Sequence, residues 1–290
     1  MPYGTDVNDV FVIDDHAYLA SYGIRVVDVS DPATPTYISS NGTQENEGQS
    51  VFVKGGYAYL ADLVFGLIIY DASDLDYPVA IDTFSSSATD VFFKDNYTYV
   101  TKGFNGIQIW DFSDMNNPDF ISNFDTPDNA VGIAVSDGYA YVADESTLEI
   151  IDVNDPANPT IVYSLPAWSA LGIDVSDNKV YLARADGLSI LDVTDPTNPT
   201  GLGSYTMYGY ATDVYVHDNI AYLIISGTAD GDQLLVIDVT DPINPLLLDN
   251  YISNHGYVET VFADDNYIYI GERKTNDNWR GGLIILEYVR

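Results

Sequence analysis

A segment of about 40 residues recurs along this chain, and this period limits the folds available to it more than any other feature. An Asp that closes a short apolar run returns at a steady spacing, at Asp28, Asp71, Asp111, Asp152, Asp192 and Asp238, with Glu287 in the last copy. A Tyr in another apolar run keeps the same period, at Tyr18, Tyr59, Tyr99, Tyr141, Tyr181, Tyr222 and Tyr269. Two markers with one period indicate seven copies of a single structural unit.

Within a unit the apolar residues alternate with a period of two, which is typical of strands. The fifth unit illustrates the pattern, with short strands predicted at Ile173–Val175, Val180–Ala183, Leu188–Val193 and Gly201–Thr206. The loop Thr194–Pro199 holds two prolines, which cannot donate to a ladder. Four short antiparallel strands per unit are typical of a propeller blade, and no window is typical of an amphipathic helix. We therefore predict an all-β, seven-bladed β-propeller.

Three of these runs also carry a resemblance to a known family. Leu148–Val153, Leu188–Val193 and Leu235–Val239 are similar to the LVIVD repeat. The resemblance implies a β-propeller of the kind found in bacterial and archaeal cell-surface proteins, and an extracellular or cell-surface location. It implies no particular ligand, because fold does not fix function.

The repeats predict a single domain over residues 1–290. Its blades are expected at about 6–48, 49–88, 89–130, 131–170, 171–211, 212–257 and 258–290. The last unit offers strands at Val261–Ala263, Tyr267–Gly271 and Leu283–Tyr288, so we expect the seventh blade to lack its outer strand. An open edge of this kind is normally covered. Our hypothesis is that the chain is a fragment of a longer protein with further domains, or that the edge pairs with another chain.

The chain is strongly acidic, with 44 acidic against 10 basic residues and a formal net charge of −34. This charge argues against nucleic acid as a partner, because phosphates require a basic face. It is compatible with a surface protein, a salt-rich habitat or a surface that collects divalent cations. Many of the Asp residues lie in repeated loops, where they favour Asx turns. The chain has no Cys and no apolar run long enough to span a membrane. Met1–Gly4 shows no signal peptide, so an exported form would have lost its leader.

The connections of a four-stranded blade (A to D) divide between its two ends. The A-to-B turns and the C-to-D loops are repetitive, and we call their end the regular side. The D-to-A and B-to-C connections vary from unit to unit, and we call their end the irregular side. Variable loops on a rigid scaffold are where binding usually occurs. Aromatic and cationic residues on this side predict a surface for a protein or glycan partner, and the residues we assign to it are Trp168, Tyr208, Tyr210, Arg184, His255, Tyr257, Arg273 and Trp279.

Two groups of carboxylates are candidate calcium sites, because Ca²⁺ requires several oxygen ligands. Asp230 and Asp232 flank a glycine in a loop, although the pattern is short of a complete EF-hand and also fits a plain hairpin turn. Asp9, Asp90 and Asp213 share one repeat position just before the first strand, where they could surround the channel of the propeller or simply contact water. No other cofactor is predicted.

Catalytic motifs are absent from the sequence: there is no nucleophile elbow, no His-Glu-Xaa-Xaa-His and no glycine-rich phosphate loop. We therefore favour a non-catalytic binding or scaffold module of an exported or cell-surface protein. One alternative is a polysaccharide-acting hydrolase or lyase with His255, Tyr257, Arg184 and Arg273 near its centre. The other alternative is an architectural spacer domain.

Overall fold

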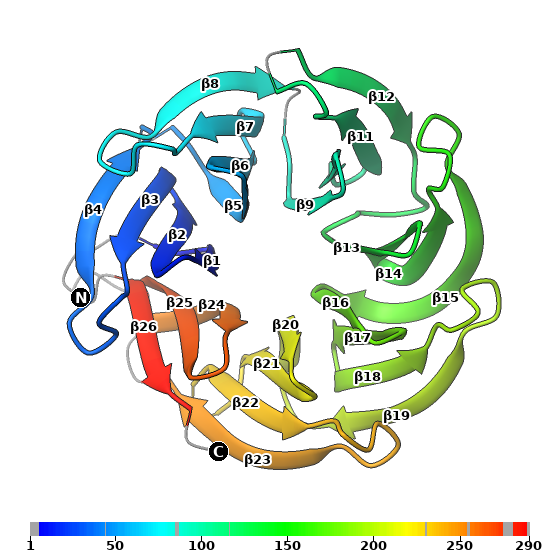
Figure 1. Ribbon diagram of the computed structural model, residues 1–290. Helices are drawn as coiled ribbons and strands as arrows, with labels where there is room; N and C mark the ends of the chain where they lie inside the picture. The colour runs from blue at the N-terminus through cyan, green and yellow to red at the C-terminus, as the bar shows by residue number, and fades with distance from the viewer. Residues whose placement is uncertain are drawn as a thin grey trace. The chain divides into compact units, whose positions relative to one another are not determined.

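The computed structural model describes residues 6–43, 45–84, 87–115, 117–229, 231–253, 256–274 and 281–288, without the side chains of Trp168 and Lys274. All elements in these ranges are β-strands, arranged as the seven small antiparallel sheets of a seven-bladed β-propeller (Figure 1). The predicted fold class is confirmed. No helix in the described residues is long and apolar enough to cross a membrane.

Each blade takes its strands in sequence order from the inner to the outer edge. The first two blades consist of β1 (Asp9–Ile13), β2 (His16–Ser21), β3 (Gly23–Asp28) and β4 (Thr36–Asn41), and of β5 (Gly48–Lys54), β6 (Tyr57–Asp62), β7 (Gly66–Asp71) and β8 (Val79–Phe84). The third and fourth consist of β9 (Asp90–Lys94), β10 (Tyr97–Thr101), β11 (Ile107–Asp111) and β12 (Asp119–Phe124), and of β13 (Gly132–Ser136), β14 (Tyr139–Asp152) and β15 (Thr160–Ala170).

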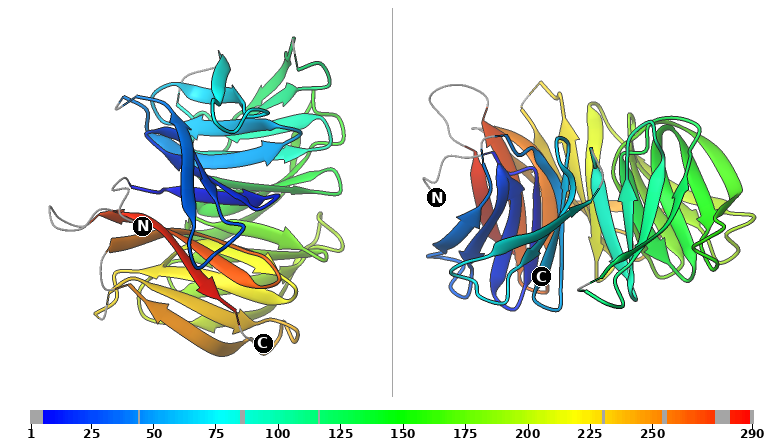
Figure 2. Two further views of the ribbon diagram at one scale, coloured as in Figure 1. Left: turned by 60° about the vertical axis from the view of Figure 1, so that its left-hand side comes forward. Right: turned by 90° about the horizontal axis from the view of Figure 1, so that it is seen from above.

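The remaining blades follow the same plan. The fifth consists of β16 (Ile173–Ser176), β17 (Lys179–Arg184), β18 (Gly187–Asp192) and β19 (Thr200–Thr206). The sixth consists of β20 (Tyr210–His217), β21 (Ile220–Ser226), β22 (Gln233–Asp238) and β23 (Leu246–Ile252), and the seventh of β24 (Gly256–Ala263), β25 (Tyr267–Lys274) and β26 (Gly282–Glu287). Figure 2 shows the progressive twist from strand to strand within the blades, as expected for L-residues.

The seventh blade has three strands in the described residues, as predicted, and β26 forms its outer edge. The fourth blade carries three strand labels, because β14 covers two of its strands. The sequence pattern predicts separate strands at Tyr139–Ala143 and Leu148–Val153, and the chain reverses direction between them, since Glu145 has a positive φ of 45° and the N–H of Val153 donates to the carbonyl of Gly138 at 2.9 Å. The first half of β14 pairs with β13 and the second half with β15, so this blade keeps the four-stranded plan.

The turns on the regular side explain why the repeats end their strands where they do. In five blades the turn between the first two strands carries two successive residues with positive φ, such as Asp177 (50°) with Asn178 (56°) and Asp218 (48°) with Asn219 (61°). Two positive φ angles define the type I′ turn, whose twist matches that of a hairpin. Asp and Asn tolerate this conformation better than other non-glycine residues.

The Asp that marks each repeat ends the third strand of its blade and begins an Asx turn. In the first six copies its Oδ1 accepts the backbone N–H two residues further on, at 2.7 to 3.0 Å, in the pairs Asp28–Ser30, Asp71–Ser73, Asp111–Ser113, Asp152–Asn154, Asp192–Thr194 and Asp238–Thr240. Hydrogen bonds from Ser30 and Thr194 lower the pKa values of the carboxyls of Asp28 and Asp192. Turn chemistry therefore accounts for much of the excess of Asp.

The hydrophobic core is divided into clusters that lie between consecutive blades. One cluster joins Tyr18, Ile24 and Val26 of the first blade to Val51 and Leu60 of the second. Comparable clusters join the third blade to the fourth, the fourth to the fifth, the fifth to the sixth and the seventh to the first. The marker Tyr is at most 5% exposed in all seven blades. A single repeat therefore cannot bury its apolar faces alone, as in other repeat proteins.

Contacts divide the chain into two compact units. Unit 1 comprises residues 1–91 and 253–290, and unit 2 comprises residues 92–252. Unit 1 holds the first, second and seventh blades, and unit 2 holds the fourth, fifth and sixth with most of the third. The expectation of one domain with the stated repeat bounds stays a prediction.

Candidate binding surfaces

Two tyrosines of unit 2 stand out on the irregular side. Tyr208 is 95% exposed, and Tyr210, the first residue of β20, is 60% exposed. Gly209 lies between them with φ of +120°, and a Cβ there would lie 2.6 Å from the Ile225 side chain. Only glycine fits this position, and its backbone brings the two aromatic side chains to the surface beside the loop after β21.

That loop, residues 226–233, contains the first predicted calcium site. Asp232 is buried, and its carboxylate accepts the N–H of Gly227 and the hydroxyl of Ser226, both at 3.1 Å. Gln233 donates to the hydroxyl of Thr228 at 3.0 Å. These hydrogen bonds connect residues 226–228 with residues 232 and 233. Asp230 lies outside the described residues, so a calcium site here stays a prediction.

Arg184 ends β17 on the same side of unit 2. Its guanidinium makes a bidentate pair with Asp186, with Nε–Oδ1 2.5 Å and Nη2–Oδ2 2.7 Å. This hydrogen bonding raises the pKa of Arg184 and lowers that of Asp186. The planar fork of Arg is thus held in one orientation, with part of the side chain still exposed.

In unit 1, Tyr257 and Arg273 are directly opposite each other on β24 and β25. Tyr257 is 49% exposed. Arg273 pairs with Glu259, with Nε–Oε1 3.2 Å. Three other predicted residues cannot be placed in this way: His255 and Trp279 lie outside the described residues, as does the Trp168 side chain, although the Trp168 backbone belongs to β15. The predicted surface is therefore described only in part.

A polar pocket of about 300 Å³ opens on the irregular side of unit 1. Its walls come from the approach to β1, the β2–β3 turn, the β4–β5 loop, the β6–β7 turn and β25, and its lining is Asp6, Asn8, Ser21, Tyr22, Asn46, Glu47, Gln49, Leu63 and Arg273. Arg273 is thus shared by the predicted surface and this pocket.

One buried carboxylate organises a wall of the pocket. Asp62, at the end of β6, is fully buried. Its Oδ2 accepts the side-chain amide of Asn46 at 3.1 Å and the N–H of Glu47 at 2.9 Å. Its Oδ1 accepts the N–H groups of Val64 and Phe65 at 2.8 and 2.9 Å. Asp62 therefore fixes the β4–β5 loop against the β6–β7 turn, as a charge that is buried but fully hydrogen-bonded can do.

Unit 2 has a counterpart at the same repeat position. Asp144 is fully buried and accepts the Thr126 hydroxyl at 2.7 Å and the Asp128 N–H at 2.8 Å. Burial raises the pKa of this carboxyl, against the effect of its hydrogen bonds. Asp144 lies beside a second hollow, of about 560 Å³, which is lined by Asp128, Glu145, Ser146, Ser169 and Leu171.

The second predicted calcium site consists of Asp9 and Asp90, the first residues of β1 and β9, and Asp213, the fourth residue of β20. In each case Oδ1 accepts the N–H of the next residue, at 2.7 to 2.9 Å. Asp9 and Asp90 belong to unit 1 and Asp213 to unit 2, so a shared site is not assigned. Calcium binding by these residues stays a prediction.

Asp174 makes similar contacts within unit 2. Its Oδ1 accepts the N–H of Val175 at 2.7 Å and its Oδ2 the N–H of Val216, in the next blade, at 2.8 Å. Burial raises the pKa of this carboxyl to about 6.

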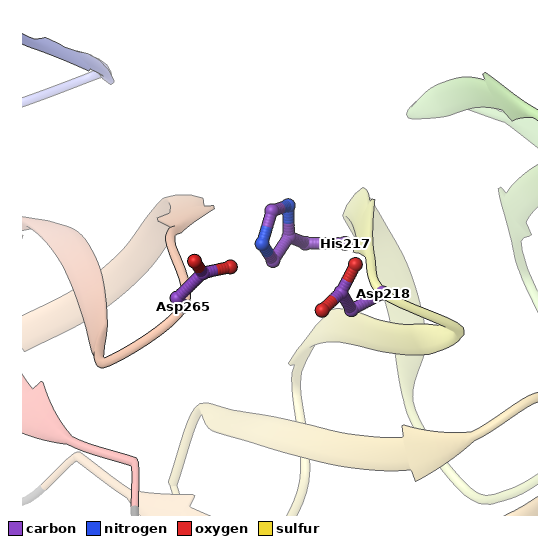
Figure 3. Close-up of side chains that lie close together, drawn as sticks. All are labelled: His217, Asp218 and Asp265. Carbon is purple, nitrogen blue, oxygen red and sulfur yellow. The ribbon is translucent and has the colours of Figure 1, made fainter.

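Figure 3 shows three further side chains that could ligate a metal, His217, Asp218 and Asp265. His217 and Asp218 come from the end of β20 and the turn after it in unit 2, whereas Asp265 follows β24 in unit 1. Because they belong to different units, we build no site from them.

The sequence matches a family model over most of its length. The LVIVD repeat matches residues 4–43, 47–86, 85–126, 127–165, 169–207 and 208–253. The chain belongs to the LVIVD-repeat family. The earlier resemblance is therefore confirmed, and it extends over six of the seven copies.

Solved structures share the fold of this LVIVD-repeat chain at low sequence identity. The computationally designed Ika8 protein is 13% identical, with a TM-score of 0.68, and the match covers 99% of this chain and 98% of the other. A functionally unknown protein from Desulfotomaculum acetoxidans is 13% identical, with a TM-score of 0.68 and coverage of 96% and 98%. A hypothetical selenium-binding protein from Sulfolobus tokodaii is 12% identical, with a TM-score of 0.73 and coverage of 95% and 88%. These likenesses concern the fold alone. No curated protein matches the chain.

Sequence reasoning overlooked the buried acids of the LVIVD repeats. Asp62 and Asp144 both lie three residues after the marker Tyr of their blades, Tyr59 and Tyr141. Alignment of the repeats on that Tyr would have shown a charged residue next to an apolar strand. The partners of these acids come from loops with no repeated pattern, so the pocket itself had no such signal.

Proposed function

We propose that this LVIVD-repeat propeller is a non-catalytic binding or scaffold module of an exported or cell-surface protein, and that it recognises a protein or a glycan through its irregular side. The observation that carries the proposal is the pair Tyr208 and Tyr210, which are separated only by Gly209 and whose side chains are largely exposed. Large aromatic side chains provide much contact area at low entropic cost, and they are enriched where binding energy concentrates.

The charge of the chain supports a soluble module with neutral or cationic partners. A net charge of −34 keeps a protein soluble and repels anionic partners such as nucleic acid. The LVIVD-repeat family supports an exported or cell-surface location through its association with cell-surface proteins. The hydrolase or lyase and the spacer domain are alternatives that no specific contact among the described residues favours, and we do not propose them.

The proposal is tested by replacing both tyrosines, in the variant Tyr208→Ala/Tyr210→Ala. The probes are an array of neutral and charged oligosaccharides and an array of extracellular peptides. The matched control is Tyr77→Ala, because Tyr77 is 75% exposed but lies in the β7–β8 loop on the regular side. We expect binding to at least one class of probe, lost in the double variant and retained in the control. Equal binding by all three proteins, or none above that of an unrelated acidic protein, would contradict the proposal.

A further inference from the structure

The pocket of unit 1 offers hydrogen-bond acceptors and donors in one small space. Asp6 and Glu47 bring carboxylates, Arg273 brings a guanidinium, and the side chains of Asn8 and Gln49 bring carboxamides. Carboxylates only accept, guanidinium only donates and carboxamides do both. A ligand that fits such a lining must itself present groups that donate and accept, and the hydroxyls of a sugar do so.

The charges of the pocket disfavour an anionic ligand. Its two carboxylates outnumber its one guanidinium, and Arg273 is already paired with Glu259. The chain as a whole carries a formal charge of −34, which repels anions at longer range. Arg273 in turn disfavours a compact cation between the two acids. The lining is therefore best matched by a neutral polar molecule.

The residue that would make the strongest single contact is held in place before any ligand arrives. The N–H of Glu47 donates to Asp62 at 2.9 Å, and its carbonyl accepts the N–H of Leu63 at 3.0 Å. The side-chain amide of Gln49 also donates to the Glu47 carbonyl, at 3.1 Å. The backbone of Glu47 is thus fixed on both sides while its side chain is exposed. Preorganisation of this kind lowers the cost of binding.

Two lining residues carry buried oxygens that lack a hydrogen bond. Oδ1 of Asn8 and Oγ of Ser21 have no partner in the described part of the chain, and Ser21 is only 3% exposed. The Asn8 side chain is otherwise anchored, since its Nδ2 donates to the Gly48 carbonyl at 2.8 Å. Buried polar atoms are normally paired, so unpaired ones point to an absent partner. Hydroxyl groups of a ligand would provide that partner.

An aromatic ring completes the lining. Tyr22 is 42% exposed and lies in the β2–β3 turn, and Leu63 provides an apolar contact. The apolar C–H face of a pyranose packs on an aromatic ring, while its hydroxyls form hydrogen bonds around the edge.

We propose that this pocket binds a neutral pyranose unit of a glycan, with Glu47 and Arg273 on its hydroxyls, Tyr22 against its apolar face and Asp62 as a positioning residue. The inference rests on the proposed function, because it names a ligand class for one part of the irregular side. It adds a site in unit 1 that is independent of Tyr208 and Tyr210 in unit 2.

The test measures ligand binding to the complete chain by ligand-observed saturation-transfer NMR. The probes are the methyl glycosides of glucose, galactose, mannose and N-acetylglucosamine, with methyl glucosaminide and methyl galacturonide as cationic and anionic counterparts. The variants are Glu47→Ala and Tyr22→Ala. The matched control is Glu45→Ala, an exposed Glu of the same loop that does not line the pocket. Loss of a hydrogen bond to a charged group predicts about tenfold weaker binding for Glu47→Ala.

The outcomes separate this inference from the proposed function. Binding of a neutral glycoside that Glu47→Ala and Tyr22→Ala weaken, and Glu45→Ala does not, supports the pocket. Binding of only the cationic or the anionic probe overturns it. Glycoside binding that Glu47→Ala and Tyr22→Ala leave unchanged overturns the pocket inference as well. If Tyr208→Ala/Tyr210→Ala abolishes that binding, the proposed function still stands. If no glycoside binds while an array probe still does, the pocket inference alone fails.

Discussion

The carboxylate of Asp9 accepts the backbone N–H of Val51, 42 residues further along the chain, at 2.8 Å. Asp9 begins β1, and Val51 lies on β5, the innermost strand of the next blade. An innermost strand has one side without a ladder partner, so its N–H groups need other acceptors. Asp174 accepts the N–H of Val216 in the same way, also 42 residues further on. A carboxylate on one blade thus satisfies the open edge of the next.

Replacement of Asp9 by Ala should destabilise the protein clearly. Three donors lose their acceptor, namely the N–H groups of Val10 and Val51 and the hydroxyl of Thr260. Unsatisfied buried donors cost about 1–3 kcal/mol, and we expect a loss in this range in the free energy of unfolding. Urea denaturation measures it, with Glu45→Ala as a surface control. A loss no larger than that of the control would mean that water replaces the carboxylate without cost.

The conservative variant Asp62→Asn should lower the free energy of unfolding as much as Asp62→Ala. Both oxygens of Asp62 accept, so an amide group must face N–H donors, either those of Val64 and Phe65 or those of Asn46 and Glu47. We expect a loss of about 2–3 kcal/mol. In this variant, amide hydrogen exchange should accelerate more at these residues than in the rest of unit 1. Exchange that rises evenly over unit 1 would argue against a local role for Asp62.

The protein should unfold in alkali because its repeated tyrosines are buried. Burial raises the pKa values of Tyr99, Tyr141 and Tyr181 to about 12 from the ordinary 10. The folded state therefore keeps these protons while the unfolded state loses them. Stability is complete below a pH of about 10 and falls as the pH rises towards about 12. Ultraviolet absorbance of phenolate and circular dichroism should change together in this window.

Matched variants separate the buried from the exposed tyrosines. Tyr141→Phe removes one buried phenol and should move the alkaline midpoint upward, whereas Tyr208→Phe should not move it. Ionisation of all 24 tyrosines at a pH of about 10, with the fold intact, would contradict the argument.

Salt of any kind should raise the thermal midpoint. The acidic groups behind the formal charge of −34 repel one another in the folded state, and ions screen this repulsion. The two oxygens of Asp232 already accept hydrogen bonds from its own loop, so we expect Ca²⁺ to act no more strongly than NaCl and MgCl₂ at equal ionic strength. Melts with each salt and with a chelator provide the comparison. A rise specific to Ca²⁺ would instead support the calcium sites at Asp230 and Asp232 or at Asp9, Asp90 and Asp213.

The sequence predicts what depends on the repeat and not what depends on the loops. Strand period, the Asx turn at Asp192 and the burial of Tyr181 all follow from local pattern, which recurs in every copy. The three strands of the seventh blade in the described residues could be predicted for the same reason. The two strands within β14 could be predicted as well, at Tyr139–Ala143 and Leu148–Val153, whereas the hydrogen bond from the Thr126 hydroxyl to Asp144 could not.

The candidate pocket shows the same limit. Arg273 could be predicted to lie on the irregular side, but its neighbours Asn8 and Glu47 come from segments whose sequence is not repeated in the other copies. The hydrogen bonds of Asp62 to Asn46 and Glu47, 16 and 15 positions away, and the hydrogen bond from Asn8 to the Gly48 carbonyl bring these segments into one wall. Exposure of Tyr208 also depends on the backbone of Gly209, which the sequence alone does not specify.

Unit 1 is assembled from both sides of unit 2 in the chain, and this order matters for biosynthesis. A ribosome releases β1 to β8 first, but the carbonyl of Glu272 that accepts the N–H of Val7, and the hydroxyl of Thr260 that donates to Asp9, are made only after all of residues 92–252. The blades of unit 2 can therefore complete their mutual contacts during translation. The first blade can form its contacts with the seventh only after the last strands have been synthesised. Nascent chains halted after residue 252 should present a folded middle and an unfinished beginning, which is the point at which a chaperone would be needed most.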